Sequence, residues 1–400
     1  MPKALLENLV FLQPNEAWPK VRFGDVVHQV KVAVDPFESG LDRYIAGDHM
    51  DTDDLRIHRW GVIGDGYLGP AFHRRFEVGD VLYGSRRTYL RKVAVADFSG
   101  VCANTTFVCR PADGRLSAAF LPLVMQTEAF HANSIAKSKG GVTPYINWPD
   151  IASYEFPLPP PGVQRRIVEL VGRADAVVHA HERVAQAVET SLTVSLEKLL
   201  SREAWREHCC SEVLREAPRN GLSIRANDEE RGLPTLNIGA IQDGGVVTEG
   251  FTKYADTKRE TVAPYFLRKG DVLVIRGNGN RDLTGRCGIV GEGLEGYFYP
   301  DLLIRLAFDE EQLRPDFGAL QWNSRPVQRE LTKRAKSTNG IWKVNGKDVA
   351  QQRVRVPPLP VQDEFLARAA VIRTFFTVAK QRLAEARDIR TALLNGLLAA

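Results

Sequence analysis

The sequence lacks the features that mark membrane and secreted proteins. Its 400 residues contain no run of about 18 apolar residues, so no transmembrane helix is predicted. The five cysteines are odd in number and include no Cys-x-x-Cys pair, which predicts neither a disulfide framework nor a zinc site. We therefore expect a protein of the reducing cytoplasm that has no membrane partner.

The short motifs of common enzyme classes are also missing. The Gly346-Lys347 pair is followed by aspartate, where a phosphate-binding loop needs serine or threonine. Neither a Gly-x-Ser-x-Gly elbow nor a His-Glu-x-x-His helix occurs. The eight histidines are scattered along the chain. We expect no catalytic residue, no metal site and no cofactor in this chain.

The chain also has no large excess of positive or negative charge. The chain has 53 lysines and arginines against 49 acidic residues, a formal net charge of +4. This balance is only mildly basic, so a surface for nucleic acid has to come from local clusters of lysine and arginine.

The most informative feature that is present is a long internal repeat. Phe156-Pro-Leu-Pro-Pro-Pro-Gly-Val-Gln164 introduces one helical pattern, and Val356-Pro-Pro-Leu-Pro-Val-Gln362 introduces another, 362 − 164 = 198 residues later. At the same spacing Asn147 matches Asn345, and Asp150 matches Asp348. Solenoid repeats have periods of about 20–50 residues, so this one indicates a duplicated unit of a domain followed by a helix.

Each proline-rich entry is followed by an apolar seam with heptad spacing. Roughly 40 residues of helix span about 60 Å. An amphipathic helix must bury its apolar face against a partner. Two helices of equal length in one chain therefore predict an antiparallel pair, and the duplication predicts a pseudo-twofold relation between the two domains. The alternative is that they are ordinary core helices of two adjacent domains. The predicted seam residues are Ile167, Leu170, Val177, Val184, Val188, Phe365, Ile372, Phe376, Leu383 and Leu393.

The remaining sequence mixes short β-like runs with turn residues, and 116–135 reads as a helix. The predicted fold class is α+β, with two similar mixed α/β domains joined by two long antiparallel coiled-coil helices. The predicted boundaries are residues 1–160 for the first domain, 161–205 for the first helix, 206–356 for the second domain and 357–400 for the second helix. Asn395-Gly396 is expected to fray the end of the second helix.

Basic clusters stand at matched places in both predicted domains. Lysine and arginine neutralise phosphates, and arginine and asparagine are common readers of guanine and adenine. A solvated loop is the alternative for any single cluster, but the duplication favours contact with DNA. The candidate residues are Arg74, Arg75, Arg86, Arg87, Tyr89, Arg91, Lys92, Lys137, Lys139, Arg276, Asn278, Asn280, Arg281, Arg286, Lys333, Arg334 and Lys336.

With these motifs in this order, the chain resembles the DNA-specificity subunits of type I restriction–modification systems. Gly79-Asp-Val-Leu-Tyr83, its counterpart Gly270-Asp-Val-Leu-Val274 and the two proline-rich entries carry the resemblance. It implies two target-recognition domains that each read half of a bipartite sequence in double-stranded DNA, with helices that set the unread gap. It also implies docking of two modification (methyltransferase) subunits, which restriction subunits join. S-adenosylmethionine, ATP and magnesium would then belong to these partners.

Two other interpretations are left open by the sequence. The chain could be a non-enzymatic coiled-coil scaffold whose domains bind proteins or RNA, in which case neutralising the basic loops should be tolerated. It could also serve a solitary methyltransferase system that has no nuclease. The target bases and the gap length are not encoded in any pattern that composition reveals.

Overall fold

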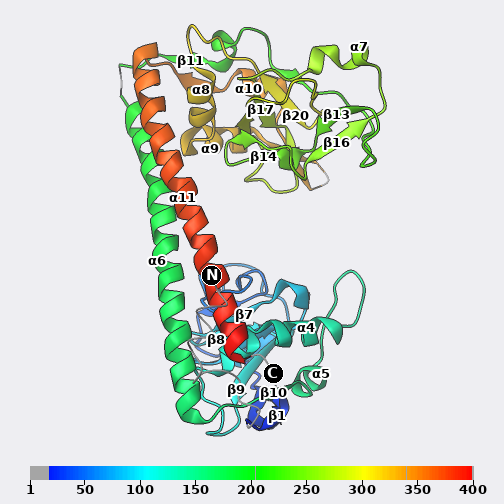
Figure 1. The fold of residues 1–400 in the computed structure, drawn as a ribbon, viewed down its shortest axis with the longest axis vertical. Helices are drawn as coiled ribbons and strands as arrows, with labels where there is room; N and C mark the ends of the chain where they lie inside the picture. The colour runs from blue at the N-terminus through cyan, green and yellow to red at the C-terminus, as the bar shows by residue number, and fades with distance from the viewer. Residues whose placement is uncertain (1–17, 203, 339, 399–400) are drawn as a thin grey trace. The chain divides into compact units, whose positions relative to one another are not determined.

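The computed structural model describes residues 18–202, 204–338 and 340–398. The chain divides into two compact units, residues 1–183 with 380–400 and residues 184–379. Each unit holds one mixed α/β domain and a stretch of each of two long helices, α6 (Pro161–Leu200) and α11 (Leu359–Leu398) (Figure 1).

The first domain is built on two four-stranded sheets. One has the order β2-β9-β6-β7 and the other the order β4-β3-β8-β5, and β1 pairs with β10. The strands are β1 (Lys20–Arg22), β2 (Val27–Val30), β3 (Arg43–Ile45), β4 (Gly61–Val62), β5 (Phe72–Phe76), β6 (Val81–Gly84), β7 (Val93–Val95), β8 (Gly100–Ala103), β9 (Thr106–Pro111) and β10 (Glu155–Pro157). The helices are α2 (Phe23–Val26), η2 (Thr88–Leu90), α3 (Leu121–Met125), α4 (Glu128–Ala136) and α5 (Trp148–Ala152).

The main core of this first unit reaches into the long helices. Phe23, Phe120 and Phe130 are fully buried in it, and Ile167 of α6 and Leu394 of α11 belong to the same cluster. Burying one large apolar side chain stabilises a fold by about 1.5–3 kcal/mol, so this cluster joins the domain and its helices firmly.

The second domain has a six-stranded sheet of order β12-β20-β17-β19-β15-β14 and a separate three-stranded sheet of order β18-β22-β21. Its strands are β11 (Glu207–Cys209), β12 (Arg219–Asn220), β13 (Leu233–Leu236), β14 (Ile241–Gln242), β15 (Gly245–Val246), β16 (Thr252–Ala255), β17 (Val272–Ile275), β18 (Gly277–Asn278), β19 (Cys287–Ile289), β20 (Leu303–Leu306), β21 (Lys336–Thr338), β22 (Ile341–Lys343) and β23 (Arg353–Arg355). Its helices are η3 (Cys210–Val213), η4 (Ile238–Ala240), α7 (Arg259–Val262), η5 (Ala263–Tyr265), α8 (Pro315–Trp322), α9 (Arg325–Arg334) and α10 (Gly346–Ala350).

A buried glutamine fixes the start of each long helix. In the first unit Gln164 Nε2 donates to Arg115 O at 2.7 Å and Pro159 O at 2.8 Å, while Ser117 N donates to Gln164 Oε1 at 2.9 Å. Both this glutamine and its repeat partner Gln362 are fully buried. We call the two arrangements the glutamine clamps.

The second clamp repeats the first bond by bond. Gln362 Nε2 donates to Gln312 O at 2.9 Å and Pro357 O at 2.7 Å, and Arg314 N donates to Gln362 Oε1 at 2.8 Å. The proline-rich entries therefore start the helices, since proline fits the first helical turn, and the glutamines tie those starts to the domains.

The two helices run antiparallel within each unit. In the first, Asp175 of α6 pairs with Arg390 of α11, and Glu182 further along α6 pairs with Arg387, which lies earlier on α11. Each helix has 40 residues. The first helix ends at Leu200, short of the predicted 205, and α11 continues unbroken through Asn395 and Gly396.

The fraying predicted at Asn395-Gly396 is therefore wrong. Asn395 Oδ1 accepts a hydrogen bond from Glu128 N at 2.9 Å, which holds this turn against α4. The helix predicted over 116–135 is also interrupted, because Thr127 caps a new helix by accepting a bond from Phe130 N at 3.2 Å.

Two predicted seam positions on α6 are wrong. Val177 and Val184 are both 51% exposed, whereas the adjacent Val178 and Ala185 are buried. Each pair offers two neighbouring apolar residues, so the heptad pattern fits either register and only packing decides between them. The other predicted positions, Ile167, Leu170, Val188, Phe365, Ile372, Phe376, Leu383 and Leu393, are buried or half-buried.

Candidate nucleic-acid interface

In the first domain two basic loops lie side by side. The loop that follows β6 contains Arg86, and the loop 137–145 follows α4. Arg86 and Lys139 each form an antiparallel β-bridge with Tyr145, and Arg87 N donates to Pro144 O at 2.6 Å. These bonds join two clusters that are about 50 residues apart in sequence into one surface.

The side chains at this surface differ in whether they have partners within the domain. Arg86, Arg87 and Tyr89 are exposed. Lys139 pairs with Asp150 at 3.3 Å, and its side chain is 58% exposed, while Lys137 Nζ donates to Ser153 Oγ at 2.7 Å.

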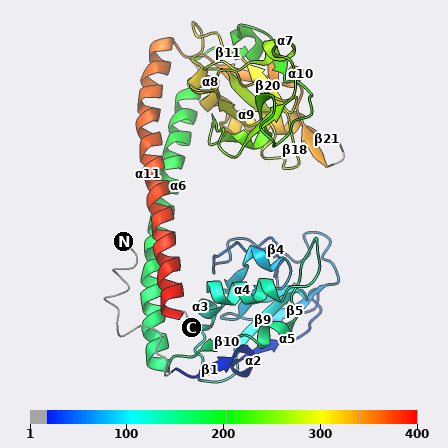
Figure 2. The ribbon, with the colours of Figure 1, turned by 45° about the vertical axis from the view of Figure 1, so that its right-hand side comes forward.

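The second domain has the same arrangement built from regular strands. Strand β18 pairs with β22, which pairs with β21, so that Gly277 and Lys336 both lie opposite Lys343. Lys343 stands 343 − 145 = 198 residues after Tyr145, and the two therefore occupy equivalent positions. Strand β21 is an outer strand of this three-stranded sheet, next to β22 (Figure 2). We call the three strands with loop 276–286 the basic ribbon.

Several predicted DNA contacts already have partners inside their own domain. Arg91 binds Asp53 at 2.8 Å and Glu128 at 2.6 Å. Arg276 Nη1 donates to Asp301 O at 3.1 Å, and Arg286 Nη1 donates to Asn323 O at 3.1 Å. The same kind of internal bond engages Lys92 with Gly47 O, Arg74 with Val30 O, Arg75 with Glu77, and Arg334 with Asp348 O.

The other predicted residues of the second domain lie at its surface, although Arg281, Asn278 and Asn280 also make hydrogen bonds within the domain. Arg281, Asn280, Lys333 and Lys336 are exposed, and Asn278 is half-buried.

Three residues of these surfaces were not among the predicted ones. Tyr145 bridges Arg86 and Lys139 in the first domain, and Lys343 lies opposite Gly277 and Lys336 in the second. Val142, in loop 137–145, is 96% exposed. The 198-residue repeat, which relates Tyr145 to Lys343, was the sequence signal that could have identified these two residues.

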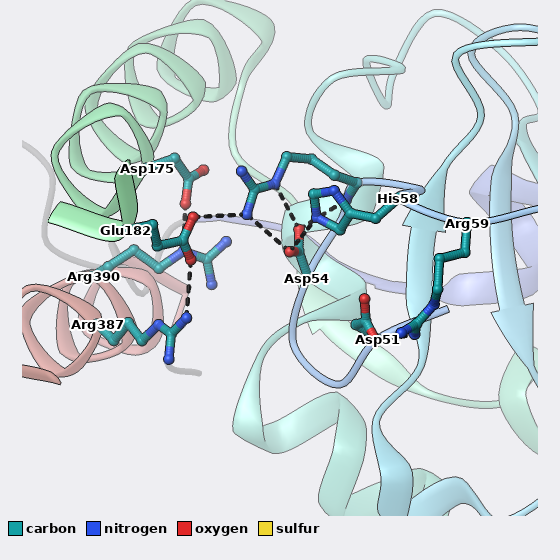
Figure 3. Close-up of polar contacts among 9 residues, drawn as sticks. Asp51, Asp54, His58, Arg59, Asp175, Glu182, Arg387 and Arg390 are labelled. Atoms are coloured by element: carbon teal, nitrogen blue, oxygen red, sulfur yellow. Dashed lines mark hydrogen bonds and ion pairs between the residues drawn. The ribbon is translucent and has the colours of Figure 1, made fainter. Parts of the chain in front are cut away.

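A network of charged groups connects the first domain to the long helices (Figure 3). Glu182 of α6 accepts from Arg387 of α11 at 2.9 Å and from Arg56 of the loop 51–59 at 3.0 Å. Arg56 in turn binds Asp54 at 2.9 Å and 3.0 Å, and Asp54 also contacts His58 at 3.0 Å. The network is confined to the first unit.

The electrostatics of this network favour the charged forms. Burial alone would raise the pKa of Asp54, but hydrogen bonds from Arg56 and His58 outweigh it and hold this pKa well below its usual range. Burial likewise opposes the charge on Glu182, yet bonds from Arg387 and Arg56 lower its pKa. Both carboxylates therefore stay ionised at neutral pH.

The described residues hold no group of three or more His, Cys, Asp or Glu side chains placed to bind a metal ion. All five cysteines are free, and burial raises the pKa of the Cys102 and Cys210 thiols to about 12. Across the helices that the structure describes, none is long and apolar enough to cross a membrane.

The fold and the paired basic surfaces together define a class: a two-domain chain in which each domain is clamped to the start of a long helix. Comparison with known proteins finds similarity to the family that the sequence motifs resemble. The chain is 26% identical over 275 residues to the type I restriction enzyme EcoKI specificity subunit of Escherichia coli (strain K12), covering 63% of this chain. It is 24% identical over 293 residues, 68% of this chain, to the StySPI specificity subunit of Salmonella potsdam.

These comparisons confirm the predicted resemblance to type I specificity subunits. The aligned parts span 58% and 62% of the length of the two relatives. No family model matches the chain. A solved chain from a study of assembly and conformational transition in a type I restriction–modification system matches at a TM-score of 0.56 with 19% identity, covering 97% of this chain and 99% of that one. This match confirms the predicted α+β fold with two domains and two long helices.

Proposed function

We propose that this chain is the sequence-specific DNA-recognition subunit of a type I restriction–modification complex. Each domain reads one half of a bipartite target in double-stranded DNA, and the two 40-residue helices set the gap between the halves. The observation that carries the proposal is the pair of basic surfaces formed at equivalent positions, around Tyr145 and Lys343. Similarity to two specificity subunits supports it.

The chain itself is non-catalytic under this proposal. Methylation and cleavage then belong to two modification subunits and to restriction subunits, which supply S-adenosylmethionine, ATP and magnesium. The complex works in the cytoplasm, where its DNA is. An exposed apolar stripe on α11 supports docking of a protein partner, since Val371, Phe375 and Val378 are 56%, 63% and 49% exposed at helical spacing.

Methylation mapping tests the proposal directly. The methylated bases of the source organism are compared with and without this gene, and loss of one bipartite motif is the expected result. An unchanged map in cells that express the chain and its modification subunits would refute target recognition. A solitary methyltransferase system would give the same loss of motif without any cleavage of unmodified DNA.

The scaffold interpretation makes a different prediction for the basic surfaces. Replacing Arg86, Arg87 and Lys336 with alanine removes three exposed phosphate-binding candidates. DNA affinity should fall by roughly tenfold or more at moderate salt, with a shallower salt dependence, since each lost phosphate contact lowers the slope by about 0.9. A scaffold that binds proteins would show neither change.

A further inference from the structure

The basic ribbon of the second domain contains one arginine, Arg281, whose side chain is held in place by an aromatic ring and a hydrogen bond. The Arg281 guanidinium lies over the Trp342 ring, 4.6 Å from its centroid, and its Nη2 donates to Thr332 O at 3.1 Å. Arg281 is nevertheless exposed. A guanidinium resting on an aromatic face keeps an N–H edge free to donate, so the side chain is both fixed and available.

The loop that presents Arg281 is itself rigid. Asn278 Oδ1 accepts from Asn280 N at 2.8 Å, and Asn280 Oδ1 accepts from Asp282 N at 2.9 Å, which gives two consecutive Asx turns. At its end, Gly285 O accepts from Trp322 Nε1 at 2.8 Å and from Gln328 Nε2 at 3.1 Å. Such a loop loses little conformational entropy when it binds.

The lysines around this loop have a different character. Lys336 and Lys343 lie directly opposite each other on β21 and β22, and both are exposed. Like charges at such positions destabilise a sheet. An anion between them would remove that repulsion, and a phosphate of nucleic acid has the required charge. Neither lysine is held over a ring or anchored to a carbonyl in the way that Arg281 is.

We infer that Arg281 reads a base in the half-site of the second domain, while Lys336 and Lys343 hold the phosphates beside it. This inference rests on the proposed function and assigns separate roles within it. A fixed, forked guanidinium suits the two acceptors on the major-groove edge of guanine, and flexible ammonium groups suit phosphate oxygens. The recognised base is therefore a guanine.

The test selects binding sites from a random DNA library with the full-length chain purified together with its bound partners. Arg281→Ala is expected to lose the preference for guanine at one position by roughly tenfold or more, with the other half-site unchanged. Arg281→Lys keeps the charge but lacks the fork and should give the same loss. Lys343→Ala should instead weaken every sequence alike and reduce the salt slope by about 1.

Arg329→Ala is the matched control, because Arg329 is an exposed arginine on α9 of the same domain, outside loop 276–286. Thermal unfolding of each variant checks that the domain remains folded. If Arg281→Ala lowers affinity equally for all sequences, Arg281 contacts phosphate and the inference is overturned. If the wild-type chain selects no bipartite sequence, the proposed function fails instead, and the two failures are distinguishable.

Discussion

At the scale of single residues, the hydrogen bonds of two buried glutamines help to attach the long helices to the domains. In each glutamine clamp, a fully buried glutamine side chain makes hydrogen bonds with two carbonyls and one amide of the main chain. A buried polar group left without a partner costs about 1–3 kcal/mol, so each clamp adds to the attachment that the hydrophobic core provides between helix and domain.

Replacing Gln164 or Gln362 with alanine should therefore lower the free energy of unfolding by about 2–4 kcal/mol. Urea denaturation measures this loss. Gln186→Ala is the control, since this exposed glutamine of α6 bonds only Thr190 at 3.4 Å and its loss should cost less than about 0.5 kcal/mol. Equal, small effects at all three positions would show that the clamps contribute nothing.

A second prediction concerns His131, which is 1% exposed and has no hydrogen-bond partner on either ring nitrogen. Burial, and then the nearby Arg91, lower the pKa of His131 to about 4. The unfolded chain binds a proton near pH 6.5 while the folded chain does not, so stability falls as the pH drops from about 6.5 to about 4. The full loss is on the order of 3 kcal/mol.

The measurement is urea denaturation of the wild type and of His131→Leu across this pH window. The variant should lose most of the pH dependence. Asp53 works in the opposite direction, because burial raises its pKa and its protonation favours the folded state. Identical pH profiles for the two proteins would contradict the role of His131.

At the scale of elements, the charged network fixes one loop of the first domain to the helices. Glu182 takes part in two ion pairs and its side chain is 25% exposed. Exposed pairs are worth about 0–1 kcal/mol each, but a shared, half-buried carboxylate couples them.

Glu182→Gln should therefore destabilise the first unit by about 1–2 kcal/mol in dilute buffer, and by less at 1 M salt, where charges are screened within about 3 Å. Thermal unfolding at the two salt concentrations measures the difference. Glu169→Gln is the control, an exposed carboxylate on the same helix. A loss that is the same at both salt concentrations would mean that packing, and not charge, is responsible.

The long helices also show which structural features could be predicted from the sequence and which could not. The 198-residue repeat predicted both long helices, and their observed starts, Pro161 and Leu359, keep that spacing. The seam on α6 could not be placed to within one residue, because Val177-Val178 and Val184-Ala185 are each apolar in both registers. Which exposed arginine stacks on an aromatic ring could not be predicted either, because Arg281 and Arg286 are both exposed and differ in tertiary partners, Trp342 and Asn323, that lie far away in the sequence.

At the scale of the whole molecule, the proposed function makes the two domains independent readers. Arg281→Ala should change one half of the target and leave the other half and the gap intact. Combining Arg87→Ala with Arg281→Ala should give additive losses of binding free energy, because the two residues belong to different compact units and are proposed to contact different half-sites. A double-mutant cycle on a defined target measures this, and a coupling above about 0.5 kcal/mol would contradict independence.

The glutamine clamps have a consequence for how freely the chain can diverge. On the domain side they touch only main-chain atoms, at Arg115, Ser117, Gln312 and Arg314. Nearly every amino acid presents the same carbonyl and amide, so the clamp itself places almost no demand on side-chain identity at these positions. One domain surface can then be exchanged for another with a different preference while the joint that carries it stays the same.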